Sequence, residues 1–195
     1  MYKSYIKRII DILMAATFLI ALSPVYLIIS ILIKLIDKGS IIYKQNRTGL
    51  YGRIFNMYKF KTMQNGNVTK LGRILRDTSL DELPQFFNVL KGDMSIIGPR
   101  PWITDYYERF NEKQKNRNKV RPGIIGLAQV NGRNKISIVE KIDYDLYYIE
   151  HISFKLDMSI LLKSFAIVFK REDIKVNDEY IRNELKKLET INEIK

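Results

Sequence analysis

Two adjacent carboxylates, Asp81 and Glu82, are the residues of this 195-residue sequence best suited to chemistry. An ionised carboxylate can attack phosphorus to form an acyl-phosphate, while its neighbour accepts a proton or positions the substrate. The same residues also fit a purely structural motif, because Ser79 and Glu82 have the spacing of a capping box. In either case we expect a helix to begin at Ser79, and its N-terminus would favour the ionised form of Asp81.

Cations that could bind phosphate occur on both sides of this pair. Arg100 stands between Pro99 and Pro101, whose fixed φ angles would hold its guanidinium ready for a phosphate. Lys59 and Arg76 are further candidates. Each of these cations could equally be a solvated surface residue, so only their joint occurrence indicates phosphoryl chemistry.

The composition restricts the chemistry to carboxylates, Lys, Arg and Tyr. With no Cys and only His151, the sequence excludes disulfides, thiolate nucleophiles and zinc sites built from Cys or paired His. A pyrophosphate substrate would need a hard cation, and Mg²⁺ is usually held by one or two carboxylates together with phosphate oxygens and water. Asp81, with Asp93 or Glu82 beside it, is the candidate Mg²⁺ site.

A long uncharged segment precedes these motifs. The 22 residues Ile12–Ile33 would form a straight helix of about 33 Å, enough for a hydrocarbon core of about 30 Å. Ser23 and Pro24 lie at its midpoint, where a proline breaks a helix, and Lys and Arg occur on both flanks instead of one. Two interpretations stay open: a single spanning helix, or a re-entrant helix–break–helix that returns to the same face.

The remaining chain is expected to be mainly helical with one small β-hairpin, an α+β fold. The hairpin is expected over Gly39–Lys61 with its turn at Thr48–Gly52, followed by a polar loop at Gln64–Lys70. Helices are expected over Leu71–Asp77, Ser79–Leu90, Asp105–Val120, Ile138–Ile149 and Asp157–Arg171, the last amphipathic and suited to the core or to a membrane interface. We divide the chain into a membrane-inserted hairpin (1–36), a catalytic domain (37–171) and a charged tail (172–195), a solvated helix or disordered.

The net charge of +12 is concentrated in residues 1–171, which carry +14, whereas residues 172–195 carry −2. So basic a body attracts phosphates, and nucleic acid, anionic lipid and nucleotide-bound substrates all qualify. One alternative to an enzyme is therefore a basic module on a spanning helix that binds nucleic acid or lipid. It would leave the carboxylate pair and the Pro-Arg-Pro motif without a role. Another alternative is a spanning protein whose domain lies outside the cytosol.

Taken together and in this order, the motifs resemble those of the bacterial sugar transferase family, the monotopic polyprenol-phosphate phosphoglycosyl transferases. The matching segments extend from residue 1 to about residue 170 and comprise Lys7–Asp11, Ser23–Pro24, Tyr58–Met63, Ser79–Gln85, Asn88–Ser95, Gly98–Pro101, Arg121–Gly123 and Gly126–Arg133. The chain is similar to the small members that consist of the catalytic domain alone, such as those that begin bacillosamine-type glycan assembly.

The resemblance implies transfer of a phosphosugar from a UDP-sugar to a polyprenol phosphate such as undecaprenyl phosphate, with release of UMP, as the first membrane step of glycan assembly. In the family's ping-pong chemistry Asp81 would attack the β-phosphorus, and Glu82 would assist as proton acceptor or positioning group. Mg²⁺ would bind Asp81 and the diphosphate. Among the cations, Arg100 would hold phosphate, Lys59 and Arg76 would support the site, and Arg133 would contact the nucleotide.

The resemblance also implies a re-entrant break at Ser23 and Pro24, with amphipathic helices lying at the interface. The protein would then sit on the cytoplasmic face of the bacterial inner membrane, where UDP-sugar meets the lipid phosphate. Its partners would be UDP-sugar, undecaprenyl phosphate and membrane lipids, and not nucleic acid.

Overall fold

The computed structural model describes residues 2–132, 135–168 and 178–193, which form a mostly helical fold, consistent with the predicted α+β class. These residues contain three two-stranded sheets, whereas only one hairpin was predicted. The helices are α1 (Lys7–Ala21), α2 (Ser23–Leu32), α3 (Lys70–Asp77), α4 (Gln85–Lys91), α5 (Thr104–Glu108), α6 (Glu112–Lys115), α7 (Leu127–Val130), α8 (Ile138–Glu150), α9 (Phe154–Val168) and α10 (Asp178–Glu193). The strands are β1 (Ile42–Thr48), β2 (Ile54–Phe60), β3 (Met63–Gln64), β4 (Asn67–Val68), β5 (Ser95–Ile97) and β6 (Gly123–Ile125).

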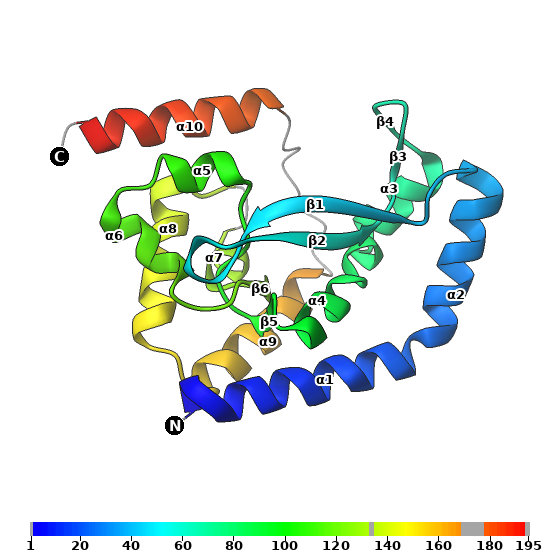
Figure 1. Cartoon of the computed structure of the whole chain (residues 1–195), viewed down its shortest axis with the longest axis horizontal. Coiled ribbons are helices and arrows are strands. Elements are labelled where there is room, and N and C mark those ends of the chain that lie inside the picture. The colour runs from blue at the N-terminus through cyan, green and yellow to red at the C-terminus, as the bar shows by residue number, and fades with distance from the viewer. Residues whose placement is uncertain (1, 133–134, 169–177, 194–195) are drawn as a thin grey trace.

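The N-terminal helices α1 and α2 meet at a sharp bend, and the β-hairpin lies on the inner side of the angle (Figure 1). Leu22 separates them, and Pro24 occupies the first turn of α2, where its missing N–H removes no helical hydrogen bond. Within the described residues no single helix has the length and hydropathy to cross a membrane. The pair Lys7–Ala21 and Ser23–Asp37, bent by 58°, meets both conditions together.

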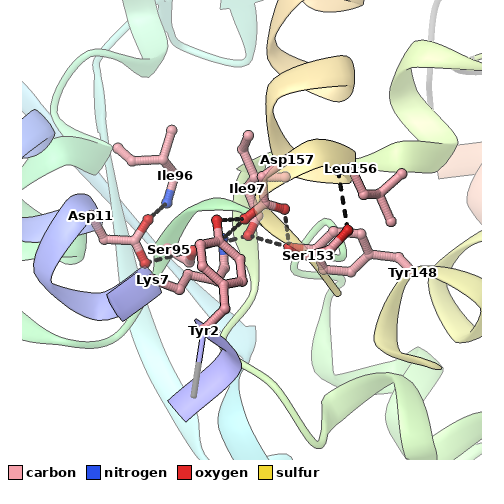
Figure 2. A network of polar contacts seen from close by, with 10 residues as sticks. All are labelled: Tyr2, Lys7, Asp11, Ser95, Ile96, Ile97, Tyr148, Ser153, Leu156 and Asp157. Carbon is pink, nitrogen blue, oxygen red and sulfur yellow. Dashed lines mark hydrogen bonds and ion pairs between the residues drawn. The ribbon is translucent and has the colours of Figure 1, made fainter. Parts of the chain in front are cut away.

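A buried carboxylate on α1, Asp11, fixes this helix to strand β5. One oxygen of Asp11 accepts a hydrogen bond from Ser95 Oγ at 2.8 Å, and the other accepts one from the Ile96 backbone N–H at 2.9 Å (Figure 2). Asp11 is 4 % exposed, so its charge is stabilised by these donors and not by water. The uncharged segment Ile12–Ile33 is therefore preceded directly by a residue that anchors α1 to the rest of the protein.

A second buried carboxylate, Asp157 near the start of α9, joins three elements. It accepts hydrogen bonds from the Tyr2 hydroxyl at 2.6 Å, from Lys7 Nζ at 2.8 Å and from the Tyr148 hydroxyl at 2.8 Å (Figure 2). These contacts hold the beginning of α1 against α8 and α9. The main hydrophobic core lies beside them, between α1, α4, β5, α8 and α9, and includes Ala15, Val89, Ile96, Tyr148 and Ile160.

The predicted hairpin is confirmed. Strands β1 and β2 pair antiparallel with Thr48 opposite Ile54, so the turn falls within the predicted segment. The predicted polar loop Gln64–Lys70 is wrong in part, because β3 and β4 form a second small hairpin and Lys70 begins α3. Asn65 and Gly66 both have positive φ angles at its turn, as an Asn-Gly pair in a hairpin commonly does.

The predicted single helix Asp105–Val120 is wrong. It is divided into α5, α6 and a 3₁₀ turn at Asn116–Asn118. The Asn111 side chain accepts from the Gln114 N–H at 2.9 Å and so starts a new helix, while Phe110 turns inward and is 5 % exposed. Burial of Phe110 and the new cap together outweigh continuation of the helix.

The two C-terminal helices differ from the predictions in extent and burial. Helix α9 begins at Phe154, before the predicted start. Residues 169–171 of the predicted helix lie outside the described residues. Ile160 is fully buried while Leu162 and Phe165 are exposed, so α9 presents apolar residues both to the core and to its outer surface.

Helix α10 forms most of the charged tail. The tail was predicted to be solvated, but one face of α10 is buried. Leu185 and Leu188, three residues apart, are buried against Tyr106 of α5 and Ile142 of α8. The prediction rested on overall charge and overlooked this spacing, which places both leucines on one face. Figure 1 shows α10 across the molecule from α1.

Candidate active site

The carboxylate pair lies in a 3₁₀ turn, η4 (Leu80–Glu82), between α3 and α4. The predicted helix start and capping box at Ser79 are wrong. Ser79 has a left-handed backbone (φ 56°), and its N–H donates to the Arg76 carbonyl oxygen at 3.0 Å, so this N–H is not available to Glu82. Pro84 has no N–H to donate to Leu80, and α4 begins only after it.

Glu82 is the centre of a cationic cluster. Its Oε1 lies 2.7 Å from Lys59 Nζ and 2.8 Å from Arg100 Nη2, and it accepts a hydrogen bond from each. Burial alone would raise the pKa of Glu82, but the charges of Arg100 and Lys59 overcome burial and hold that pKa well below its usual range. Glu82 is therefore ionised at neutral pH and is a poor proton acceptor.

Asp81 has a different environment from its neighbour. Its carboxylate is buried, Lys59 Nζ lies 3.9 Å from its Oδ2, and no described residue donates a hydrogen bond to it. Burial raises the pKa of Asp81, Lys59 opposes this effect, and the charge of Glu82 adds to it. A helix N-terminus at Ser79 was predicted to favour the ionised form of Asp81 and so to lower its pKa. The pKa is raised instead, because α4 starts four residues after Asp81. Asp81 is thus a poorly solvated carboxylate beside cations, with its oxygens free to react.

Arg76 and Arg100 bring guanidinium groups to this pair from two further elements. Arg76, on α3, donates from Nε to the buried Thr62 Oγ1 at 2.8 Å, and its charge also lowers the pKa of Asp81. The structure therefore brings together four of the residues predicted from three segments of the sequence, namely Lys59, Asp81, Glu82 and Arg100. Arg76 is close enough for its charge to act on Asp81.

The loop that carries Arg100 is held by a buried ion pair that sequence analysis missed. Arg117 donates to Asp145 Oδ2 from Nε at 3.0 Å and from Nη2 at 2.7 Å, and Nη2 also donates to the Arg100 carbonyl oxygen at 2.7 Å. The guanidinium of Arg117 lies 4.2 Å from the centre of the Trp102 ring. The two prolines beside Arg100 are thus only part of what positions it.

Arg47, on β1, is another residue that sequence analysis missed. Burial, together with the neighbouring charge of Arg100, lowers the pKa of Arg47 to about 10. Its Nη2 donates to Gln45 Oε1 at 2.6 Å, whereas its buried Nε has no partner among the described residues. The only signal in the sequence is an Arg two positions after Gln45 in the hairpin, which places both on one face. A desolvated cation with an unused donor suits an anionic substrate.

One predicted site residue, Asp93, does not join the cluster. Asp81 precedes α4 and Asp93 follows it, so a seven-residue helix of about 10 Å separates them. Asp93 instead accepts a hydrogen bond from Asn88 Nδ2 at 3.2 Å and pairs with Lys91 at 3.3 Å. The geometry therefore does not support one Mg²⁺ shared by Asp81 and Asp93. Arg133 lies outside the described residues.

The donor set still fits a magnesium ion bound mainly by substrate. Among the described residues, no group of three or more His, Asp or Glu side chains could hold a metal ion. Mg²⁺ needs only one or two carboxylates when phosphate oxygens and water complete its coordination. Asp81, whose carboxylate accepts no hydrogen bond from the described residues, meets this requirement.

The active-site turn is also tied to the N-terminal segment. The Tyr26 hydroxyl, on α2, donates to the Leu83 carbonyl oxygen at 2.5 Å, directly after η4. Ile29 and Ile33 pack with Phe60 and Leu75 in a small core under the cluster. The bent helix pair therefore supports the carboxylate turn directly.

Comparison with known proteins identifies the family. Residues 2–171 match the model of the bacterial sugar transferase family. The chain is 43 % identical over 182 residues to the protein named uncharacterized sugar transferase EpsL of Bacillus subtilis, covering 87 % of this chain and 90 % of that protein. It is 42 % identical over 186 residues to the UDP-glucose:undecaprenyl-phosphate glucose-1-phosphate transferase of Klebsiella pneumoniae, covering 84 % of this chain and 39 % of the relative.

A third relative, the UDP-N-acetylgalactosamine-undecaprenyl-phosphate N-acetylgalactosaminephosphotransferase of Aeromonas hydrophila, is 40 % identical over 185 residues, covering 85 % of this chain and 44 % of that protein. The chain thus spans most of EpsL but less than half of the other two relatives. These matches confirm the predicted family and the predicted enzyme class, a phosphoglycosyl transferase. We conclude that the chain belongs to the bacterial sugar transferase family.

Proposed function

We propose that this enzyme transfers a phosphosugar from a UDP-sugar to undecaprenyl phosphate and releases UMP. The observation that carries the proposal is Asp81, a buried carboxylate with no hydrogen bond from the described residues, beside the cations that Glu82 organises. The names of the Klebsiella and Aeromonas relatives, which include undecaprenyl phosphate and UDP-sugars, support this substrate pair.

The proposed reaction has two steps. An oxygen of Asp81 attacks the β-phosphorus of the UDP-sugar, an O–P bond forms, and the bond from that phosphorus to the oxygen bridging to UMP breaks. UMP leaves with the electron pair. A phosphate oxygen of undecaprenyl phosphate then attacks the same phosphorus, and the Asp81 carboxylate leaves. Burial of Asp81 supports its role as the nucleophile, because a poorly solvated carboxylate is more reactive.

The surrounding residues would stabilise the charge that moves during these steps. Lys59, Arg76 and Arg100 would bind the diphosphate oxygens. Glu82 would act as a positioning residue, because its two ion pairs keep it ionised and fix Lys59 and Arg100. Mg²⁺, bound by Asp81 and the diphosphate oxygens, would neutralise phosphate charge. Arg133 stays a predicted contact of the nucleotide.

We also propose that the bent helix pair is re-entrant and holds the enzyme on the cytoplasmic face of the bacterial inner membrane. Lys and Arg flank both ends of the pair, and apolar side chains are exposed along it, at Ile9, Ile12, Leu13, Ile20, Leu27, Ile28 and Ile31. The exposed Leu162 and Phe165 of α9 suit an interfacial position. Nucleic acid has no role in this proposal.

The topology is tested with cysteines introduced singly at Lys3 and Lys38, both exposed positions. In inner-membrane vesicles of known orientation, a membrane-impermeant thiol reagent should label both cysteines from the cytoplasmic side. Labelling of the two positions from opposite sides would show a spanning helix and exclude re-entry.

The reaction is tested by measuring UMP release from a panel of UDP-sugars with undecaprenyl phosphate and Mg²⁺. One or more UDP-sugars should give UMP, and Asp81→Asn should abolish the release. Asp77→Asn, which changes an exposed carboxylate four residues earlier, is the matched control and should retain activity. If Asp81→Asn also retains activity, the proposal fails, and the basic binding module becomes the better interpretation.

A further inference from the structure

A cationic cavity of about 270 Å³ lies between the start of α1, the turn of the β1–β2 hairpin and the segment that leads to β6. Five cations from three parts of the chain line it, together with one carboxylate: Lys3, Lys7, Arg8, Lys119, Arg121 and Asp11. None of these cations takes part in the transfer chemistry proposed above. The proposed transfer reaction therefore does not explain the positive charge of this cavity.

Two of the cations are held at one point. Arg8 donates to the carbonyl oxygens of Val89 at 2.7 Å and Leu90 at 3.2 Å, and Arg121 Nε donates to that of Gly92 at 2.9 Å. A methyl group on Gly92 would lie 3.5 Å from Arg8 Nη2. Both guanidinium groups thus converge on the C-terminal end of α4, where the helix dipole favours positive charge.

Capping of α4 does not explain the other cations. Lys3 donates to the Ile149 carbonyl oxygen at 3.2 Å, and the Lys119 side chain has no hydrogen bond or ion pair with another described residue. Lys7 is neutralised by Asp157 at 2.8 Å, and both oxygens of Asp11 already accept hydrogen bonds. Among the described lining residues, the positive charge of the cavity therefore exceeds its negative charge.

We propose that this cavity binds the phosphate group of an anionic ligand. Converging Arg and Lys donors that are already held in place are the arrangement that proteins use for phosphate. The site is distinct from the Asp81 cluster, because it lies at the C-terminal end of α4 while Glu82 precedes the N-terminal end. The cavity is smaller than the roughly 300 Å³ at the lower end of typical ligand pockets, so it suits a phosphate headgroup better than a whole nucleotide.

Two sources of phosphate are possible at this place: an anionic phospholipid headgroup beside the membrane hairpin, or free phosphate from the cytosol. We would titrate the full-length protein in detergent micelles with dioctanoyl phosphatidylglycerol, dioctanoyl phosphatidylcholine or inorganic phosphate. Native mass spectrometry would count bound lipid, and calorimetry would measure phosphate binding. Two variants each reverse the charge of a lysine that lines the cavity: Lys119→Glu and Lys3→Glu. The control variant, Lys113→Glu, reverses the charge of an exposed lysine outside the cavity.

The wild type and Lys113→Glu should bind one phosphatidylglycerol or one phosphate at least about tenfold more tightly than Lys119→Glu and Lys3→Glu do. If phosphatidylglycerol binds and inorganic phosphate displaces it, the cavity is a site for a lipid headgroup. If inorganic phosphate binds and the lipid does not, the cavity is a site for the free ion. Equal binding by all four proteins, or phosphatidylcholine bound as tightly as phosphatidylglycerol, would overturn the proposal. An unchanged melting temperature of each variant confirms its folding. These readouts do not use the transfer reaction, so they stand apart from the proposed function.

Discussion

Glu82→Gln is the substitution that separates the two roles open to the second carboxylate. Glutamine keeps the shape of Glu82 but removes the charge that holds Lys59 at 2.7 Å and Arg100 at 2.8 Å. Because both cations donate to the same atom, Oε1, the amide oxygen of glutamine can still accept both hydrogen bonds, but the acceptor no longer carries a charge. We expect Lys59 and Arg100 to be held less firmly beside the diphosphate site as a result.

The magnitude follows from the acceptor charge that is lost. A charge-assisted hydrogen bond contributes about 1.5–3 kcal/mol, which corresponds to about 10- to 100-fold in kcat/KM. Because the Arg100 side chain is 38 % exposed and water screens its charge, we expect a loss near the lower end, about tenfold. Glu112→Gln, at a carboxylate that is 91 % exposed and paired with Lys115, is the matched control and should change the rate less than about twofold.

The assay is UMP release measured as a function of pH. Because the pKa of Glu82 is far below its usual range, the acidic limb of the rate profile should belong to Asp81. Glu82 raises the pKa of Asp81, so Glu82→Gln should keep this limb and move it to lower pH. Loss of the limb, or a rate loss of a thousandfold or more, would show that Glu82 is the proton acceptor. A limb at higher pH would contradict the electrostatic reasoning.

Three further outcomes are expected. Lys59→Gln removes a charge that lowers the pKa of Asp81, so the acidic limb of the pH profile of UMP release should move to higher pH. An unmoved limb would show that the charge of Lys59 does not affect the titration of Asp81. Arg47→Met removes a buried cation whose Nε has no partner among the described residues, so the melting temperature should be unchanged or higher. The kcat/KM for the UDP-sugar should fall about tenfold. A lower melting temperature would contradict the expectation that Arg47 does not stabilise the fold. Asp11→Ala removes the acceptor of both hydrogen bonds and leaves the buried Ile96 N–H without it, so thermal unfolding should show about 2 kcal/mol of lost stability. Unfolding like that of the wild type would mean that this anchor is weak.

Two Ser-x-x-Glu segments, which have the spacing of a capping box, show what local patterns can and cannot predict. At Ser137 and Glu140 the box forms, with the Ser137 N–H donating to Glu140 Oε2 at 2.8 Å, and helix α8 begins where predicted. At Ser79 and Glu82 the same spacing fails, because the Ser79 N–H closes α3 and distant cations attract Glu82. Local patterns predict an element correctly when no long-range charge competes for its side chains.

In the candidate active site, too, some residues could be predicted from the sequence and others could not. Asp81, Lys59 and Arg100 could be selected from residue type and from the rigid Pro-Arg-Pro context, and the resemblance to a known family gave them roles. Arg47 and Arg117 could not be selected, because their importance comes from burial and from partners far along the chain. Helix α10 illustrates the opposite problem, since its two buried leucines were visible in the sequence but were outweighed by the charge of the tail.

The central claim is that Asp81 forms a covalent bond to phosphorus during transfer. The most direct measurement is the intact mass of the protein after incubation with its UDP-sugar and Mg²⁺ in the absence of undecaprenyl phosphate, followed by peptide mapping. The account predicts a mass increase of one phosphosugar on the peptide that contains Asp81, lost again when the lipid phosphate is added. An enzyme that releases UMP with the lipid present but gains no mass without it would contradict the account.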